Sequence, residues 1–234
     1  MKPIEIPEFI DKYKIYEREG GVIDFRIFQL DTEQNDTPYQ KHLAVAQQTL
    51  VSVADEVNTH LDRLAAKQKI NRKELFTMDY DFRALKDSGK EISVADFMGW
   101  QYEEVSGRVK ILNYNLVNPK TNGYDLYFYY NEKEVIENAL IIAQEDKGEI
   151  GFVYAFLDPP HSFMSGKTIF EKGKFFLDIC ELLFTDISEI EVYQWSIDSS
   201  NYFDEGKEWW GSFFWTVYNP YQDWYIGIMA STTD

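Results

Sequence analysis

The chain has 234 residues, of which 44% are hydrophobic and 17% aromatic, so it is long and apolar enough to bury a core. Its 40 acidic residues outnumber its 23 lysines and arginines, and the formal net charge is −17. Because such a field repels phosphate backbones and anionic lipid surfaces and speeds encounter with basic proteins, we expect a basic protein partner and neither nucleic acid nor a membrane.

The first thirty residues predict a β-hairpin. The run KYKIYERE precedes Gly20-Gly21, and Ile23, Phe25 and Ile27 then share one face of a second strand. The opening MKPIEIPEF has two prolines and no apolar run of signal-peptide length, which predicts no secretory leader.

A long helix is predicted from residue 38 to about residue 69. Thr37 and Gln40 form a capping-box pattern around a proline at the first helical position. Apolar residues at steps of three or four predict one buried stripe, made of Leu43, Ala46, Leu50, Val53, Val57, Leu61 and Leu64. His42 and His60 lie five turns apart, roughly 27 Å, so they cannot share a metal ion. We expect both at the surface or at a helix end.

Residues 71–106 show no sustained period and are predicted to connect the long helix to the C-terminal half. Asn71 and Ser93 are candidate caps of short helical turns within this connector.

From residue 107 the pattern predicts strand, strand, helix, strand, helix, strand, strand, strand. The corresponding ranges are 107–118, 123–131, a helix capped by Asn131, 149–158, 169–185, 187–198, 213–219 and 223–231. Hairpins at both ends of this run predict an α+β fold with a largely antiparallel sheet and packed helices. We thus expect residues 1–106 (hairpin, long helix, connector) and 107–234 (α+β core) to form one compact domain.

Cys180, the one cysteine, lies in the apolar run KFFLDICELLF, which predicts a buried thiol. A single cysteine excludes an internal disulfide and a cysteine-based zinc site. No apolar run reaches the eighteen residues that a membrane span needs. We expect a soluble, cytoplasmic protein.

The sequence SGKT at residues 165–168 is the closest approach to a phosphate-binding loop. That motif needs a glycine five positions before Gly166, where His161 stands. Thr168 and Glu171 fit a capping box instead, so the hydroxyl has a structural role without magnesium. We predict no nucleotide or other cofactor.

A small hydrolase or cation-dependent enzyme is an alternative interpretation. Asp158 could orient His161 toward Ser162 or Ser165, although no G-x-S-x-G elbow presents a serine for attack. Two acidic pairs could contact a hard cation, but neither has the glycine and distal glutamate of a calcium loop, so we predict no metal site. These pairs are Asp79 with Asp81, and Glu103 with Glu104.

The aromatic stretch EWWGSFFWTVYNPYQDWYIG at residues 208–227 is predicted to be mainly core. Alternation places large apolar side chains on one face of two strands, namely Phe213, Trp215, Val217, Trp224, Ile226 and Ile228. The opposite face carries Phe214, Thr216, Tyr218 and Tyr225, which suit a half-exposed surface or a covering helix.

Our leading functional hypothesis is a non-enzymatic protein-binding module, immunity-like in the physical sense that an acidic face masks a basic target. Trp209 and Trp210 follow the acidic loop NYFDEGKE, and indoles of this kind form interface hot spots. The candidate partner-binding residues are Asp204, Glu205, Glu208, Trp209 and Trp210. The alternatives are a plug beneath the loop for the two indoles, the enzyme above, and a carbohydrate-binding module.

Overall fold

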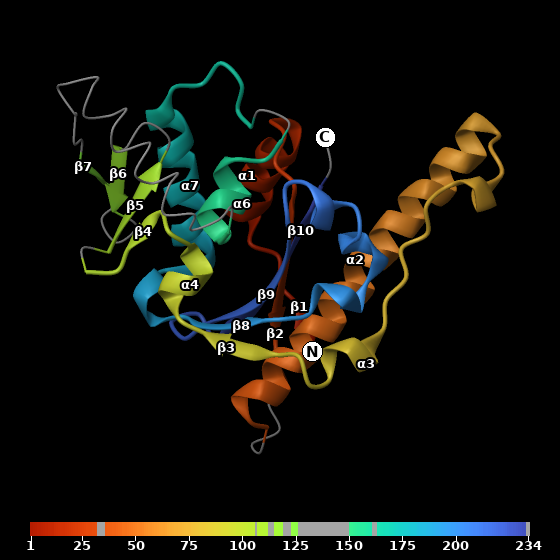
Figure 1. The fold of residues 1–234 in the computed structure, drawn as a ribbon, viewed down its shortest axis with the longest axis horizontal. Helices are drawn as coiled ribbons and strands as arrows, with labels where there is room; N and C mark the ends of the chain where they lie inside the picture. Colours follow the sequence, from red (N-terminus) through yellow and green to blue (C-terminus); the bar gives the residue numbers. More distant parts are fainter. Residues whose placement is uncertain are drawn as a thin grey trace.

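The computed structural model describes residues 1–31, 36–105, 107–111, 115–118, 123–125, 150–160 and 163–232. A six-stranded antiparallel sheet organises the molecule (Figure 1). Its order is β1 (Lys2–Pro3), β2 (Ile23–Gln29), β10 (Trp224–Ser231), β9 (Ser212–Asn219), β8 (Glu191–Gln194) and β3 (Lys90–Ile92). The predicted α+β class is confirmed, and the sheet draws strands from both segments of the chain.

Helix α2 (Pro38–Gln68) covers one face of this sheet and confirms the predicted long helix. Its predicted capping box is present, with Thr37 Oγ1 accepting from Gln40 N at 3.3 Å. Gly227 of β10 lets the helix approach, because a Cβ there would collide with the Thr49 side chain. Beyond Ala54 only Ala65 of α2 is buried, and Figure 1 shows this end of the helix projecting from the body.

The opposite face of the sheet carries an aromatic core under four helices (Figure 1). These are α1 (Pro7–Arg18), α4 (Val94–Met98), α6 (Phe152–Leu157) and α7 (Ile169–Phe184). The predicted core face of β9 and β10 packs here, while Phe214 and Met229 pack under α2. Cys180 is buried as predicted, and burial raises the pKa of its thiol.

Two predicted strands are helices. The first strand of the expected hairpin is α1, because Phe9, Tyr13 and Tyr16 recur at helical spacing and Pro7 suits the first turn. The expected strand at 149–158 contains α6, all six residues of which are buried. A run that is apolar on every side has no periodicity, so it fits a buried helix as well as a strand.

A second, four-stranded antiparallel sheet contains β4 (Tyr102–Glu103), β5 (Arg108–Ile111), β6 (Asn115–Asn118) and β7 (Gly123–Asp125). The single strand expected at 107–118 is therefore two strands, paired as Val109 with Val117 and Ile111 with Asn115. Alternation continues through both strands and does not mark the turn between them. The helix expected after Asn131 lies outside the described residues.

Short helical turns supply the remaining elements. They are η1 (Arg72–Glu74), α3 (Phe82–Leu85), η3 (Ile187–Glu189), η4 (Ile197–Ser199), η5 (Asn201–Phe203) and η6 (Gly206–Glu208). The predicted caps are confirmed: Asn71 accepts from Lys73 N at 3.2 Å and Ser93 from Asp96 N at 3.0 Å. Among the helices that the structure describes, none has the length and apolar character that crossing a membrane requires.

His42 corrects the expectation of a surface histidine, because it is fully buried between α2 and the sheet. Trp195 Nε1 donates to Thr216 Oγ1 at 2.8 Å, and Thr216 Oγ1 lies 2.8 Å from His42 Nδ1. An indole only donates, so Thr216 Oγ1 accepts from Trp195, and its contact with Nδ1 holds the imidazole between α2 and the sheet. Burial lowers the pKa of His42 to about 3. His60 is exposed, as expected.

Candidate functional site

Two segments far apart in the sequence, residues 77–83 and 196–209, form one continuous surface beside α2. Tyr80 and Ser200 pair as an isolated antiparallel bridge. On either side of it, Asp81 N donates to Ser199 O at 2.8 Å and Asn201 N donates to Asp79 O at 3.3 Å. The two segments are therefore joined through their backbones.

Side chains of the second segment reinforce this pairing. Asn201 Oδ1 accepts from Asp79 N at 2.8 Å, and its Nδ2 donates to Thr77 O at 2.9 Å. Ser200 Oγ donates to Asp79 O at 2.7 Å. These bonds satisfy the Asp79 N–H and the carbonyls of Thr77 and Asp79 without a regular strand, so the surface has a defined shape.

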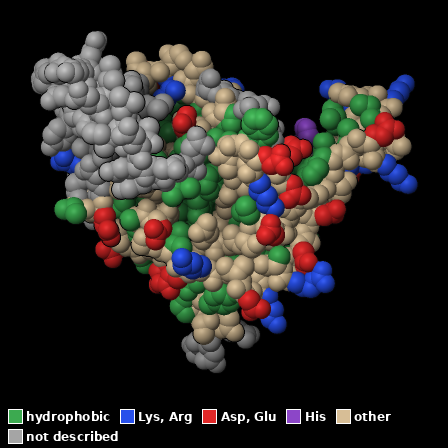
Figure 2. All heavy atoms as spheres, viewed as in Figure 1, with side chains coloured by type: hydrophobic (Ala, Val, Ile, Leu, Met, Phe, Trp, Pro, Cys, Tyr) green, Lys and Arg blue, Asp and Glu red, His purple; other side chains and the backbone are tan. Residues whose placement is uncertain are grey.

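The two segments line an open pocket of about 320 Å³, which we call the acidic pocket. Its lining consists of Asp79, Tyr80, Asp81, Asp198, Ser199, Ser200, Asn201, Asp204 and Lys207. Four carboxylates and one ammonium give this lining a formal charge of −3. Figure 2 shows acidic side chains gathering on this face, between the body and the projecting end of α2.

The carboxylates differ in how far they are neutralised. Lys207 Nζ donates to Asp198 at 2.9 Å and to Asp204 at 3.0 Å, and the bond to Asp198 raises the pKa of Lys207. Hydrogen bonds from Arg83 lower the pKa of Asp81. Within the part of the chain that the structure describes, the Asp79 carboxylate has no hydrogen bond or ion pair, so it is open to an incoming cation.

The arrangement of the carboxylates in the acidic pocket does not favour a bound metal ion. Within the described residues no group of three or more His, Cys, Asp or Glu side chains converges closely enough to hold one. Separated carboxylates are better suited to a larger ligand whose several cationic groups spread over the pocket than to a single ion.

Three exposed rings belong to the two segments that form the acidic pocket, and one of them, Tyr80, lines it. Tyr80 and Phe82 are 40% and 37% exposed and stack on each other with centroids 5.0 Å apart. Each ring gives one face to its neighbour, so the two do not form the coplanar platform that we expect of a carbohydrate site. Trp209, two residues after Lys207, is 67% exposed.

The structure separates the two tryptophans. Trp209 is exposed together with the carboxylates predicted beside it, those of Asp204, Glu205 and Glu208. Trp210 is 6% exposed, donates from Nε1 to Asp158 O at 2.7 Å and stacks on Tyr154. The alternative of a plug beneath the loop thus describes Trp210, whereas Trp209 is available to a partner.

The enzymatic alternative depends on residues that the structure describes only in part. Asp158 is exposed and its backbone carbonyl accepts from Trp210, while His161 and Ser162 lie outside the described residues. Glu104 is exposed. Of the two acidic pairs, Asp79 and Asp81 join the acidic pocket.

A second, larger pocket of about 680 Å³ lies beside β3 and α4. Trp100, Phe213 and Trp215 supply apolar wall, and Lys90 and Gln194 supply polar groups. Its lining extends to Ile150, next to residues that the structure does not describe.

Several residues of the acidic pocket were not predicted from the sequence as partner-binding: Asp79, Tyr80, Asp81, Asp198 and Lys207. Only the pairing of 77–83 with 196–209 brings them together. The alternation of acids and rings in TMDYDF is the one local signal of a binding surface. From the sequence alone, its two carboxylates are equally consistent with contact to a hard cation.

Comparisons with known proteins add no functional information. A scan against protein-family models and searches of curated proteins and of solved structures gave no match to this chain. The geometry and charge of the acidic pocket are therefore the best guide to the function of this chain.

Proposed function

We propose that this chain is a protein-binding module that docks on a basic protein through the acidic pocket and Trp209. The observation that carries the proposal is the juxtaposition of four carboxylates, one ammonium and exposed rings on a surface built by hydrogen bonds. Such a surface combines charge with apolar anchors, as interface hot spots do.

The pocket suits arginine side chains in particular. A guanidinium can form two parallel hydrogen bonds with one carboxylate, and the open Asp79 offers such a partner. Its planar group can also stack on an aromatic face, and the exposed Tyr80 lines the same pocket with Phe82 stacked against it.

The charge of the whole chain supports the same function. A formal charge of −17 attracts a basic protein before contact and accelerates association, an effect that salt screens. Trp209 then supplies contact area that salt does not weaken. We expect salt to slow association more than it speeds dissociation.

The proposal is tested by capture from the native cell lysate with four baits. They are the wild type, Asp79→Asn/Asp198→Asn, Trp209→Ala, and a control, Glu5→Gln/Asp11→Asn, that removes the same charge from exposed positions at and near α1. We expect a basic protein that the wild type and the control retain and that the pocket variant loses.

For the captured protein, Trp209→Ala should weaken affinity about 30-fold, since a hot-spot tryptophan contributes about 2 kcal/mol. Isothermal titration calorimetry at low and moderate salt gives this number. Equal binding by the pocket variant and the control would contradict the proposal.

A further inference from the structure

The projecting end of α2 has the opposite charge from the rest of the molecule. Residues 63–73, which we call the arm tip, contain five lysines and arginines and no acid, in a chain of formal charge −17. Four of these side chains are exposed and form no ion pair within the described residues, namely Arg63, Lys67, Lys69 and Lys73. Figure 2 shows basic side chains around the end of this projection.

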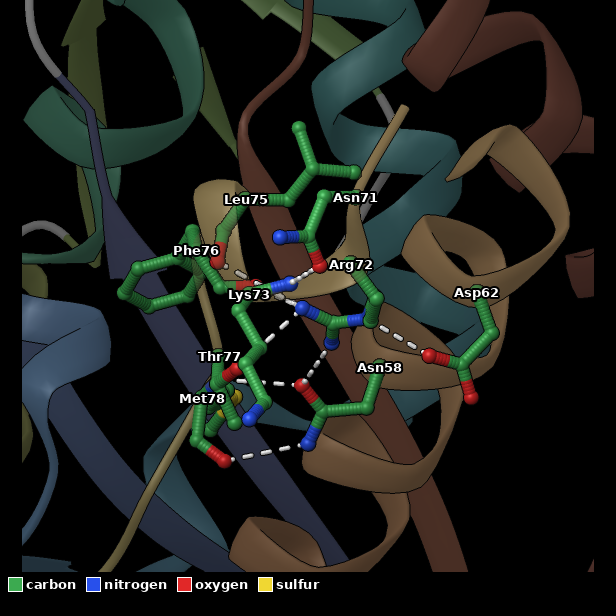
Figure 3. A network of polar contacts seen from close by, with 9 residues as sticks. All are labelled: Asn58, Asp62, Asn71, Arg72, Lys73, Leu75, Phe76, Thr77 and Met78. Atoms are coloured by element: carbon green, nitrogen blue, oxygen red, sulfur yellow. Dashed lines mark hydrogen bonds and ion pairs between the residues drawn. The ribbon is translucent and has the colours of Figure 1, made fainter. Parts of the chain in front are cut away.

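The arm tip is held rigidly by its remaining cation, Arg72. The Arg72 guanidinium donates to Asp62 at 2.6 Å on α2 and to Phe76 O at 2.8 Å on the returning segment (Figure 3). Asn58 exchanges two hydrogen bonds of 3.0 Å with the Met78 backbone. Helix and return are thereby fastened along their length, so the tip cannot bend back to the acidic pocket of its own chain.

We propose that the acidic pocket receives the arm tip of a second copy of this chain. This inference rests on the proposed function, because it assigns a partner to the same pocket. The pocket lining has a formal charge of −3, and the four unpaired cations of the tip carry a formal charge of +4, so one surface complements the other. A twofold arrangement satisfies both contacts at once, each tip on the pocket of the other copy.

Both surfaces carry apolar groups that such a contact would cover. Ile70 and Phe76, at and just after the tip, are 36% and 47% exposed, and Tyr80 and Phe82 at the pocket are exposed to a similar extent. The repulsion between two chains of charge −17 opposes pairing at long range. Salt at 0.15 M screens charges beyond about 8 Å and leaves close ion pairs largely intact, so pairing is expected near physiological salt.

A charge exchange tests the contact. The arm variant is Lys67→Glu/Lys73→Glu and the pocket variant is Asp79→Lys/Asp198→Lys. The arm variant removes most of the positive charge of the tip, and the pocket variant reverses the formal charge of the pocket lining from −3 to +1, so each alone should weaken self-association at least about tenfold. In the heterodimer one contact keeps the wild-type tip and the wild-type pocket, and the other joins the altered tip to the altered pocket. An equimolar mixture should therefore form a heterodimer more readily than either variant pairs with itself. Analytical ultracentrifugation at about 0.1 mM protein and 0.15 M salt measures the self-association of the arm variant, of the pocket variant and of their mixture. Circular dichroism confirms that each variant is folded.

A control variant, Lys2→Glu/Lys14→Glu, changes the net charge by the same amount on β1 and α1 and should pair like the wild type. A monomeric wild type, a control as weak as the arm variant, or a mixture that stays monomeric would each overturn the inference. The proposed function would survive a monomeric wild type if capture of another basic protein still required Asp79 and Asp198. If that capture were also insensitive to these residues, both proposals would be wrong.

Discussion

Trp209 and Trp210 are adjacent in sequence but have opposite surroundings. The first is 67% exposed, and the second is 6% exposed with its indole N–H bonded to the carbonyl of Asp158. The sequence predicted one role for both residues, because nothing local shows which of two adjacent indoles turns inward. Trp210 turns inward because its ring packs on Tyr154 and Phe213. Tyr154 is distant in sequence, and Phe213 lies beyond Gly211, so neither contact can be recognised from the neighbouring residues.

This contrast predicts different effects of truncation. Trp210→Ala should lower the free energy of unfolding by about 3–5 kcal/mol, because it empties a packed site. Trp209→Ala should change it by less than about 0.5 kcal/mol, as expected of an exposed side chain. Urea unfolding of both variants measures the difference, and equal losses would show that the assignment of the two rings is wrong.

His42 is the residue for which sequence reasoning failed most clearly. It sits on the apolar side of α2, where a single polar residue could equally be solvated at a helix end. Thr216 of β9 contacts its Nδ1, and Trp195, just after β8, donates to the Thr216 hydroxyl. No pattern within the helix reveals these partners.

Burial of His42 makes the stability of the protein depend on pH. The pKa of this histidine is about 3 in the folded protein, against 6.5 for the free side chain. Since the unfolded chain binds the proton more readily, His42 lowers stability as pH falls from 6.5 toward 3, by up to about 1.4 kcal/mol per pH unit.

His42→Asn keeps an acceptor near the Nδ1 position and removes the titrating group. We expect its unfolding free energy to fall less steeply than that of the wild type between pH 6.5 and pH 4. His60→Asn, on the exposed side of the same helix, is the matched control. Parallel curves for His42→Asn and the wild type would contradict a buried neutral imidazole.

At the scale of elements, caps and amphipathic stripes were predictable because they are local. The capping boxes of α2 and α7 and the strands β9 and β10 lie where the sequence indicates. Helices α1 and α6 were predicted as strands. In α6 every residue is buried, and in the run KYKIYERE a partial alternation of polar and apolar residues hides the helical spacing of the rings.

The contact of α2 with the sheet depends on Gly227. A Cβ at this position would collide with Thr49, so Gly227→Ala should push the helix outward and cost about 1–3 kcal/mol of stability. Adding Thr49→Ala should recover part of the loss, because it removes the atoms that collide. Thermal unfolding of the two single variants and the double variant tests this coupling, and strictly additive losses would contradict the close approach.

At the scale of the whole molecule, composition predicted the sign of the surface but not its pattern. The excess of acids is visible in the sequence, and so is the acidic loop before Trp209. The pairing of 77–83 with 196–209 is a long-range contact in irregular backbone, which no periodicity marks. The basic run of the arm tip is visible in the sequence. Only the structure shows that this run lies at the end of a helix that projects beyond the sheet.

The central claim is that cations bind at the acidic pocket and Trp209 rather than over the whole acidic surface. Two-dimensional NMR of ¹⁵N-labelled protein tests it directly, with an arginine-rich octapeptide as probe and Trp209→Phe to assign the indole signal. The account predicts that the Trp209 indole and the amides of 77–82 and 196–208 shift together at low salt and return at high salt. Shifts scattered over the acidic surface, with the Trp209 signal unmoved, would contradict it.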